Sequence, residues 1–124
     1  MNKKRPKHLD LLKIKLPLPG IVSILHRVSG AVLFLTLPVG LLLLDQSLRS
    51  IETYTSLSET LAHPVLKLLL MGVLWAFLHH FCAGLRYLAI DLHWVSSLAA
   101  ARTSSKLVLL VSLALTLLIG VKLW

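Results

Sequence analysis

Ionisable and hydroxyl-bearing side chains form two clusters within otherwise apolar sequence, and these are the residues that could do chemistry. The first cluster has the spacing i, i+3, i+4, i+7, which places its members on one face of a helix: Ser23, His26, Arg27 and Gly30. Such a face can donate hydrogen bonds to a carbonyl oxygen and can supply or relay protons. Equally, Arg27 could reach lipid headgroups while Ser23 caps its own backbone, and the spacing alone favours neither interpretation.

The second cluster is a helical stripe at i, i+4, i+7, i+11, made of His80, Gly84, Tyr87 and Asp91. A neutral imidazole in a helical bundle can be an axial ligand of haem iron, and a glycine one turn away leaves room for a flat macrocycle. Arg86 can pair with an anionic propionate. His79 points about 100° away from His80, so the two cannot ligate one iron. The alternative is that these histidines only hydrogen-bond to neighbouring helices, but the whole cluster favours haem ligation.

Composition indicates that membrane-spanning helices position both clusters. Of 124 residues, 56% are hydrophobic and only 15% are charged, against roughly 25% charged in soluble domains. This composition argues against a soluble enzyme or a disordered chain, and the single cysteine argues against a disulfide scaffold. No P-loop, HExxH motif or catalytic triad pattern supports hydrolase chemistry. A bilayer needs about 17–25 apolar helical residues, and three stretches lack Lys, Arg, Asp and Glu: Val28–Leu44, Leu68–Leu85 and Leu107–Val121.

We therefore predict an all-α membrane protein, a single anchor domain over 1–124, with helices at 21–47, 64–92 and 104–123. The first helix should begin near Ile21, after a Pro-Leu-Pro run, and should kink at Pro38. Pro64 suits the first turn of the second helix. Three residues are candidate N-caps of the third helix: Thr103, Ser104 and Ser105. The segment 92–101 should continue as an interfacial helix or turn.

Charge asymmetry predicts the orientation in the membrane. The segment 1–20 is a basic tail with one acid, Asp10, against six bases: Lys3, Lys4, Arg5, Lys7, Lys13 and Lys15. The segment 45–63 is acidic on balance. Basic residues collect on the cytoplasmic side, so we expect the N-terminus to face the cytoplasm or matrix and the C-terminus to face the other side. The tail lacks the apolar region of a signal peptide. The net charge of +8 then reflects topology, and no nucleic-acid partner is expected.

Two motifs now identify a family. The chain resembles the cytochrome b subunits of bacterial succinate dehydrogenase, respiratory complex II, over essentially its whole length. The first motif is Arg5-Pro6 followed by Ser-Ile-Leu-His-Arg-Val-Ser-Gly at 23–30, and the second is His-Phe-Cys-Ala-Gly-Leu-Arg-Tyr-Leu-Ala-Ile-Asp at 80–91. Three positions depart from the family pattern: Lys7 for an apolar residue, Tyr87 for His or Phe, and His93 for a small residue. The departure at 87 and the adjacent His79 leave the roles of those two positions open.

The resemblance implies a role for each matching residue. His80 corresponds to the axial ligand of haem b. Ser23 and Arg27 correspond to quinone-binding residues. The haem-contacting set comprises His26, Arg27, Gly84 and Arg86.

The resemblance also implies a location in the bacterial inner membrane, with a cytoplasmic N-terminus and a periplasmic C-terminus, and it implies partners. A b-type haem with two histidine ligands needs a second imidazole, and the third span has no histidine. One haem b would therefore be shared with a second small three-span membrane protein, so that this chain forms half of a heteromeric helical bundle in the lipid bilayer. A flavoprotein would oxidise succinate, an iron-sulfur protein would pass the electrons on, and quinone would receive them, so the chain alone should have no activity. Two alternatives are a fumarate reductase anchor and a haem-free anchor or assembly protein.

Overall fold

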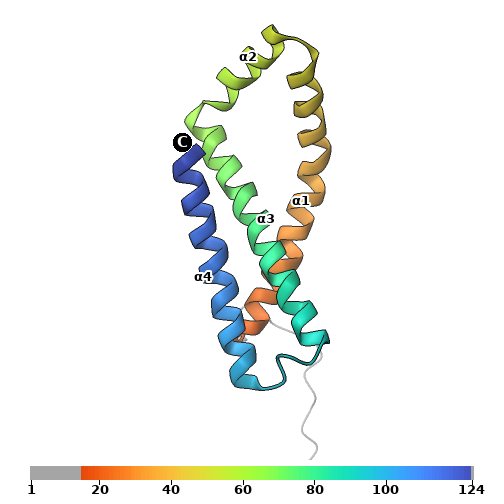
Figure 1. The fold of residues 1–124 in the computed structure, drawn as a ribbon, viewed down its shortest axis with the longest axis vertical. Helices are drawn as coiled ribbons and strands as arrows, with labels where there is room; N and C mark the ends of the chain where they lie inside the picture. The colour runs from red at the N-terminus through yellow and green to blue at the C-terminus, as the bar shows by residue number, and fades with distance from the viewer. Residues whose placement is uncertain (1–14, 124) are drawn as a thin grey trace, which may run out of the picture.

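The computed structural model describes residues 15–123, which form four helices (Figure 1). They are α1 (Leu18–Arg49), α2 (Ile51–Leu61), α3 (Pro64–Asp91) and α4 (Leu98–Leu123). Helices α1, α3 and α4 are long and apolar enough to cross a membrane, which confirms the predicted all-α membrane class. Arg5, Pro6 and Lys7 of the basic tail lie outside the described residues.

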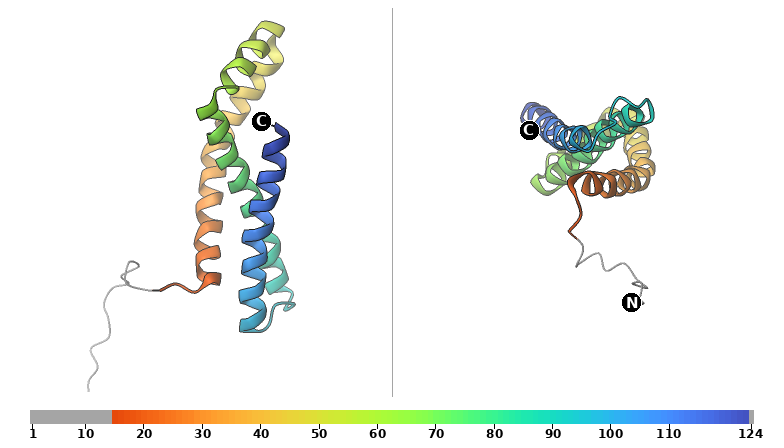
Figure 2. Two further views of the ribbon diagram at one scale, coloured as in Figure 1. Left: turned by 90° about the vertical axis from the view of Figure 1, so that its left-hand side faces the viewer. Right: turned by 90° about the horizontal axis from the view of Figure 1, so that it is seen from below.

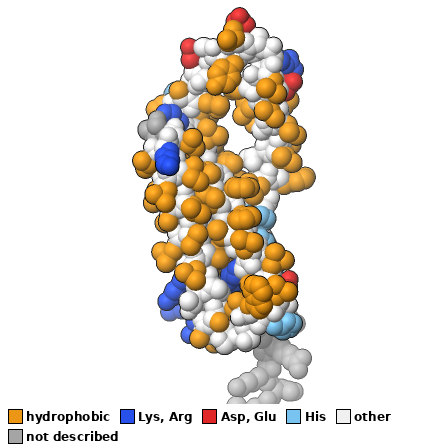
Figure 3. All heavy atoms as spheres, viewed as in Figure 1, with side chains coloured by type: hydrophobic (Ala, Val, Ile, Leu, Met, Phe, Trp, Pro, Cys, Tyr) orange, Lys and Arg blue, Asp and Glu red, His pale blue; other side chains and the backbone are white. Residues whose placement is uncertain are grey.

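Helix α3 lies between α1 and α4, and α2 links α1 to α3 at one end of the molecule (Figures 1 and 2). Large hydrophobic side chains point outward along all three long helices, and Figure 3 shows them over most of the visible face, with acidic side chains at the α2 end. This inside-out distribution suits a lipid environment, where leucine on the surface costs nothing.

Helix α1 begins three residues before the predicted start at Ile21. Pro17 is its extended N-cap residue and Pro19 lies in its first turn. The predicted start was too late because a proline is tolerated in the first turn of a helix. The N–H group that it lacks would have no carbonyl partner within the helix. At the other end, α1 continues past Pro38 to Arg49, so this proline does not end the helix. The expected kink at Pro38 stays a prediction.

Helix α2 was not predicted, because its residues are mostly polar and none of the predicted helices covers them. A reciprocal capping box starts this helix: Ser50 Oγ accepts the N–H of Thr53 at 3.2 Å, and Thr53 Oγ1 accepts the N–H of Ser50 at 3.1 Å. The pKa of the Glu52 carboxyl lies below its ordinary value. The main cause is a hydrogen bond from the Ser50 side chain, and the second is a hydrogen bond from the backbone of Glu52 itself. The Ser-x-x-Thr spacing was the signal that could have predicted this helix.

Helix α4 begins at Leu98, six residues before the predicted start. Ser97 Oγ accepts the N–H of Ala100 at 3.1 Å, which is the contact of an N-cap residue. The predicted caps Thr103, Ser104 and Ser105 lie inside the helix instead, and the hydroxyls of Ser104 and Ser105 donate to the carbonyl of Ala101. Ser97 succeeds as the cap because the uncharged residues that follow it extend the helix without a break.

Small side chains on α4 form the contact with α3. The buried positions of α4 recur every three or four residues: Ser105, Val108, Ser112, Thr116 and Gly120. The hydroxyls of Ser105, Ser112 and Thr116 donate to carbonyls of α4 itself, so these buried polar groups are satisfied. Closely packed small residues let helix backbones approach in lipid, and the contact fixes α3 against α4.

Candidate functional site

The two polar clusters meet where α1 packs against α3. The imidazole rings of His26 and His80 stack with their centroids 4.2 Å apart and their planes 13° from parallel. The Tyr87 ring lies 5.1 Å from that of His26 in a tilted arrangement. The packing of α1 on α3 therefore brings members of two clusters that are far apart in the sequence into one site, the His26–His80 site.

The His80 ring is held by α1 through its Nδ1 atom. This nitrogen lies 3.0 Å from the backbone oxygen of His26 and 3.3 Å from Ser29 Oγ. A carbonyl oxygen only accepts hydrogen bonds, so Nδ1 carries the proton and Nε2 carries the lone pair. Within residues 15–123, no hydrogen bond occupies Nε2.

A glycine lets the His80 ring approach α1. A Cβ atom added at Gly30 would stand 2.9 Å from His80 Cε1, closer than real Cβ contacts come, so a side chain at position 30 would force the His80 ring to shift. A Cβ atom at Gly84 would stand 3.8 Å from His26 Nε2, an ordinary contact. The close approach inside this chain therefore depends on Gly30, and the predicted role of Gly84 in making room for a macrocycle stays a prediction.

His79 is placed apart from this pair. It is 0% exposed and stacks on Trp75, with ring centroids 5.2 Å apart. Neither ring nitrogen of His79 has a hydrogen-bond partner among the described residues, although the backbone of Val22 lies beside it. His79 faces the interior of the three-helix unit, whereas His80 faces His26, so the adjacent histidines do point in different directions.

Arg86 joins α3 to the start of α4. Its side chain is buried, with Nε donating to Ser104 Oγ at 3.0 Å and Nη2 donating to the carbonyl of Ala101 at 3.3 Å. The guanidinium carbon also lies 5.4 Å from the centre of the Tyr87 ring. This structural contact was not predicted from the sequence. These bonds use two of the five N–H donors, and a contact with a propionate stays a prediction.

Ser23 and Arg27 lie near the beginning of α1, on either side of His26 in the sequence. Ser23 is half-buried and Arg27 is exposed, and no hydrogen bond joins the two among the described residues. Asp91 is exposed at the last residue of α3. The exposed guanidinium of Arg27 is therefore accessible to a ligand or a partner chain.

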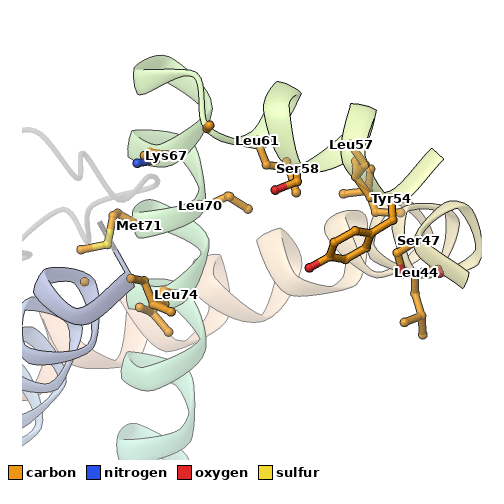
Figure 4. A pocket seen from close by; sticks show the side chains of 14 residues that line it. Leu44, Ser47, Tyr54, Leu57, Ser58, Leu61, Lys67, Leu70, Met71 and Leu74 are labelled. Carbon is orange, nitrogen blue, oxygen red and sulfur yellow. Dashed lines mark hydrogen bonds between the residues drawn. The ribbon is translucent and has the colours of Figure 1, made fainter. Parts of the chain in front are cut away.

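A separate cavity of about 640 Å³ lies toward the α2 end (Figure 4). Half of its 14 lining residues are leucine, and Tyr54, Ser58, Lys67 and Met71 are among the others. None of the predicted site residues lines it. The cavity and the His26–His80 site are thus different features of the molecule.

Comparison with known proteins decides the family. Residues 1–119 match the family of succinate dehydrogenase/fumarate reductase transmembrane subunits. The chain belongs to this family. It is 42% identical over 125 residues to the succinate dehydrogenase cytochrome b556 subunit of Coxiella burnetii, with 100% of both chains covered. It is 30% identical over 118 residues to the subunit of the same name from Rickettsia felis, covering 95% of this chain and 92% of the relative. The resemblance predicted from the sequence motifs is confirmed.

Family membership makes this chain a transmembrane subunit of an enzyme complex, in agreement with its three long apolar helices. The arrangement of its own residues also fits a haem. A metal-ligating histidine usually donates its other ring N–H to a carboxylate, a backbone carbonyl or water, and His80 makes such a bond to His26. His79 does not fit the role of a haem ligand, because its ring is enclosed between helices of its own chain.

Proposed function

We propose that this chain is the haem b- and quinone-binding membrane anchor of a succinate:quinone oxidoreductase. The observation that carries the proposal is the hydrogen bond from His80 Nδ1 to the His26 carbonyl, which fixes the tautomer with Nε2 available to iron. The names of the relatives, cytochrome b556 subunits, support the same cofactor.

In this proposal each residue of the site has a distinct task. His80 would hold the haem iron through Nε2, and a second three-span membrane protein would supply the other imidazole. Haem contacts come from His26, Arg27, Gly84 and Arg86. The bound haem would accept and return single electrons. Electrons would arrive from a flavoprotein by way of an iron-sulfur protein, and the N-terminus would face the cytoplasm, where those two partners bind.

Ser23 and Arg27 bind the quinone in this proposal. The oxygens of a quinone gain negative charge as it is reduced. A guanidinium and a hydroxyl beside one oxygen stabilise that charge more strongly than they stabilise the neutral substrate, which lowers the barrier to reduction. The exposed position of Arg27 near the beginning of α1 supports access to a ligand outside this chain.

The two adjacent histidines provide a matched test of the haem proposal. In the purified complex, His80→Leu should reduce or abolish six-coordinate low-spin haem, because Nε2 is lost. His79→Leu should largely keep it, because that ring lies inside the helical unit. Spin state should be measured by optical and EPR spectroscopy together with haem content, since a substitute ligand could retain some haem. Loss of the low-spin signal in His79→Leu alone would refute the assignment.

The same preparation separates the alternatives. A wild-type complex without a Soret band would favour a haem-free anchor. The family includes both succinate dehydrogenase and fumarate reductase subunits, so the direction is decided by the relative rates of succinate oxidation and fumarate reduction with the native quinone. The curated relatives are succinate dehydrogenase subunits, which favours succinate oxidation.

A further inference from the structure

We infer that Ser29 and Gly30 are positioning residues for the His80 imidazole, setting its orientation and its strength as an iron ligand. This inference rests on the proposed function, because it concerns the same histidine. It adds two residues of α1 that would act on the haem without touching it.

The first observation is the hydrogen bonding of Ser29. This polar side chain is only 3% exposed, and its Oγ donates to the His26 carbonyl at 2.9 Å. With its proton directed to that carbonyl, the hydroxyl keeps lone pairs that can accept from His80 Nδ1, 3.3 Å away. The Nδ1–H group of His80 is therefore shared between two acceptors on one turn of α1.

The second observation is the contact with Gly30. Its Cα presents no side chain to His80 Cε1, and an added Cβ would displace the ring. Moving the His80 ring aside would break its hydrogen bond to the His26 carbonyl and its stacking on the His26 ring. The α1 backbone thus limits one edge of the ring while the stacked ring of His26 limits its face.

These contacts have an electronic consequence. Acceptors on Nδ1–H draw that proton away and make Nε2 more electron-donating, which strengthens the ligand and favours the oxidised form of the iron. Removing one acceptor should therefore raise the midpoint potential of the haem. Displacing the ring should weaken the bond that His80 would make to the iron.

The Ser29 test compares two α1 hydroxyls in the purified complex. Ser29→Ala should raise the haem midpoint potential and lower haem affinity by roughly 10-fold, the low end of the range for such supporting contacts. Thr36→Ala should change neither, because among residues 15–123 Thr36 bonds only to carbonyls of its own helix. Ser29→Thr keeps the hydroxyl and should restore the wild-type potential. Equal potentials in Ser29→Ala and Thr36→Ala would overturn the role of Ser29.

The Gly30 test compares two glycines of the same helix. Gly30→Ala should convert part of the low-spin haem to high spin, whereas Gly40→Ala should not, because a Cβ at Gly40 has open space around it. Unchanged spectra in Gly30→Ala would overturn the role of Gly30. The potential and spin state belong to each bound haem, so a lower yield of assembled complex does not alter the result.

His80→Leu separates this inference from the proposed function. If His80→Leu keeps the wild-type low-spin haem, the ligand assignment itself is wrong. If His80→Leu loses that haem while Ser29→Ala and Gly30→Ala match their controls, the ligand assignment stands and only the positioning role fails.

Discussion

At the scale of single residues, His93 shows how a local backbone conformation ends α3. It has a φ of 62°, in the left-handed region that glycine adopts most readily. The N–H groups of His93 and Trp94 donate to the carbonyls of Ile90 and Ala89 at 2.9 and 3.0 Å, which is the Schellman arrangement. The chain therefore turns toward α4 at a position where a side chain lowers the stability of the fold.

His93→Gly should stabilise the protein by about 1 kcal/mol, because a left-handed conformation costs an L-residue roughly 1–2 kcal/mol and glycine loses part of this gain through its more flexible unfolded chain. The expected result is a higher midpoint of thermal unfolding in the detergent-solubilised complex. His93→Ala is the control, since it removes the imidazole and keeps the strain. An equal gain in both variants would show that the imidazole, and not the backbone, is unfavourable.

The residue scale also shows where sequence prediction succeeded. His79 and His80 face different directions because they are neighbours on one helix, and helical spacing is a local property. The stacking of His80 on His26 does not, because it depends on where α1 packs against α3. For the same reason, spacing could not indicate that Arg86 would be buried against Ser104.

At the scale of elements, the apolar segments predicted three long helices because a bilayer demands apolar length. Their ends were less predictable, because several residues compete as caps. Ser97, Ser104 and Ser105 all offer side-chain oxygens that could cap the helix. Ser97 is the cap because the helix is continuous from Leu98 onward. Helix α2 was missed because its signal is a capping box in polar sequence, which hydropathy does not detect.

The contact of α3 with α4 leads to a prediction at this scale. A side chain at Gly120 would overlap the end of Met71, and Met71 is flexible enough to move aside for a small group only. Gly120→Leu should therefore force the helices apart and destabilise the complex by about 1–3 kcal/mol. The measurement is thermal unfolding of the solubilised complex.

Gly72→Leu is the matched control for this packing, because a Cβ at Gly72 has open space around it. Both variants add the same apolar side chain to a membrane helix, so they differ only in what surrounds it. If Gly120→Leu is as stable as Gly72→Leu, the small residues of α4 do not determine its packing on α3.

At the scale of the whole molecule, the chain carries only part of the machinery that the proposed function requires. Its site presents one well-oriented histidine and an exposed arginine near the same end of the helical unit, while its long helices keep apolar side chains on their outer faces. The proposed function assigns electron input, the second haem ligand and succinate oxidation to other chains of the complex. A defect in this chain should consequently appear in some reactions of the complex and not in others.

The quinone assignment can be tested by comparing reactions that need quinone with reactions that do not. Ser23→Ala and Arg27→Leu should sharply lower succinate-to-quinone turnover, because each removes a donor that stabilises charge on the quinone oxygen. Removing one donor costs on the order of 10²–10³ in rate in well-studied oxyanion sites, and a wetter quinone site should show less. The measurement is steady-state turnover of the assembled complex with quinone as acceptor.

Succinate oxidation with an artificial acceptor that bypasses quinone should persist in both variants, because the proposed flavin site is on another chain. This control matters because a complex that fails to assemble would lose membrane-bound activity with both acceptors. Thr36→Ala provides a further comparison, since it removes an α1 hydroxyl whose hydrogen bonds within the described part of the chain all go to α1. Near-wild-type quinone turnover in assembled Ser23→Ala and Arg27→Leu complexes would make the first cluster structural and place quinone binding at other residues.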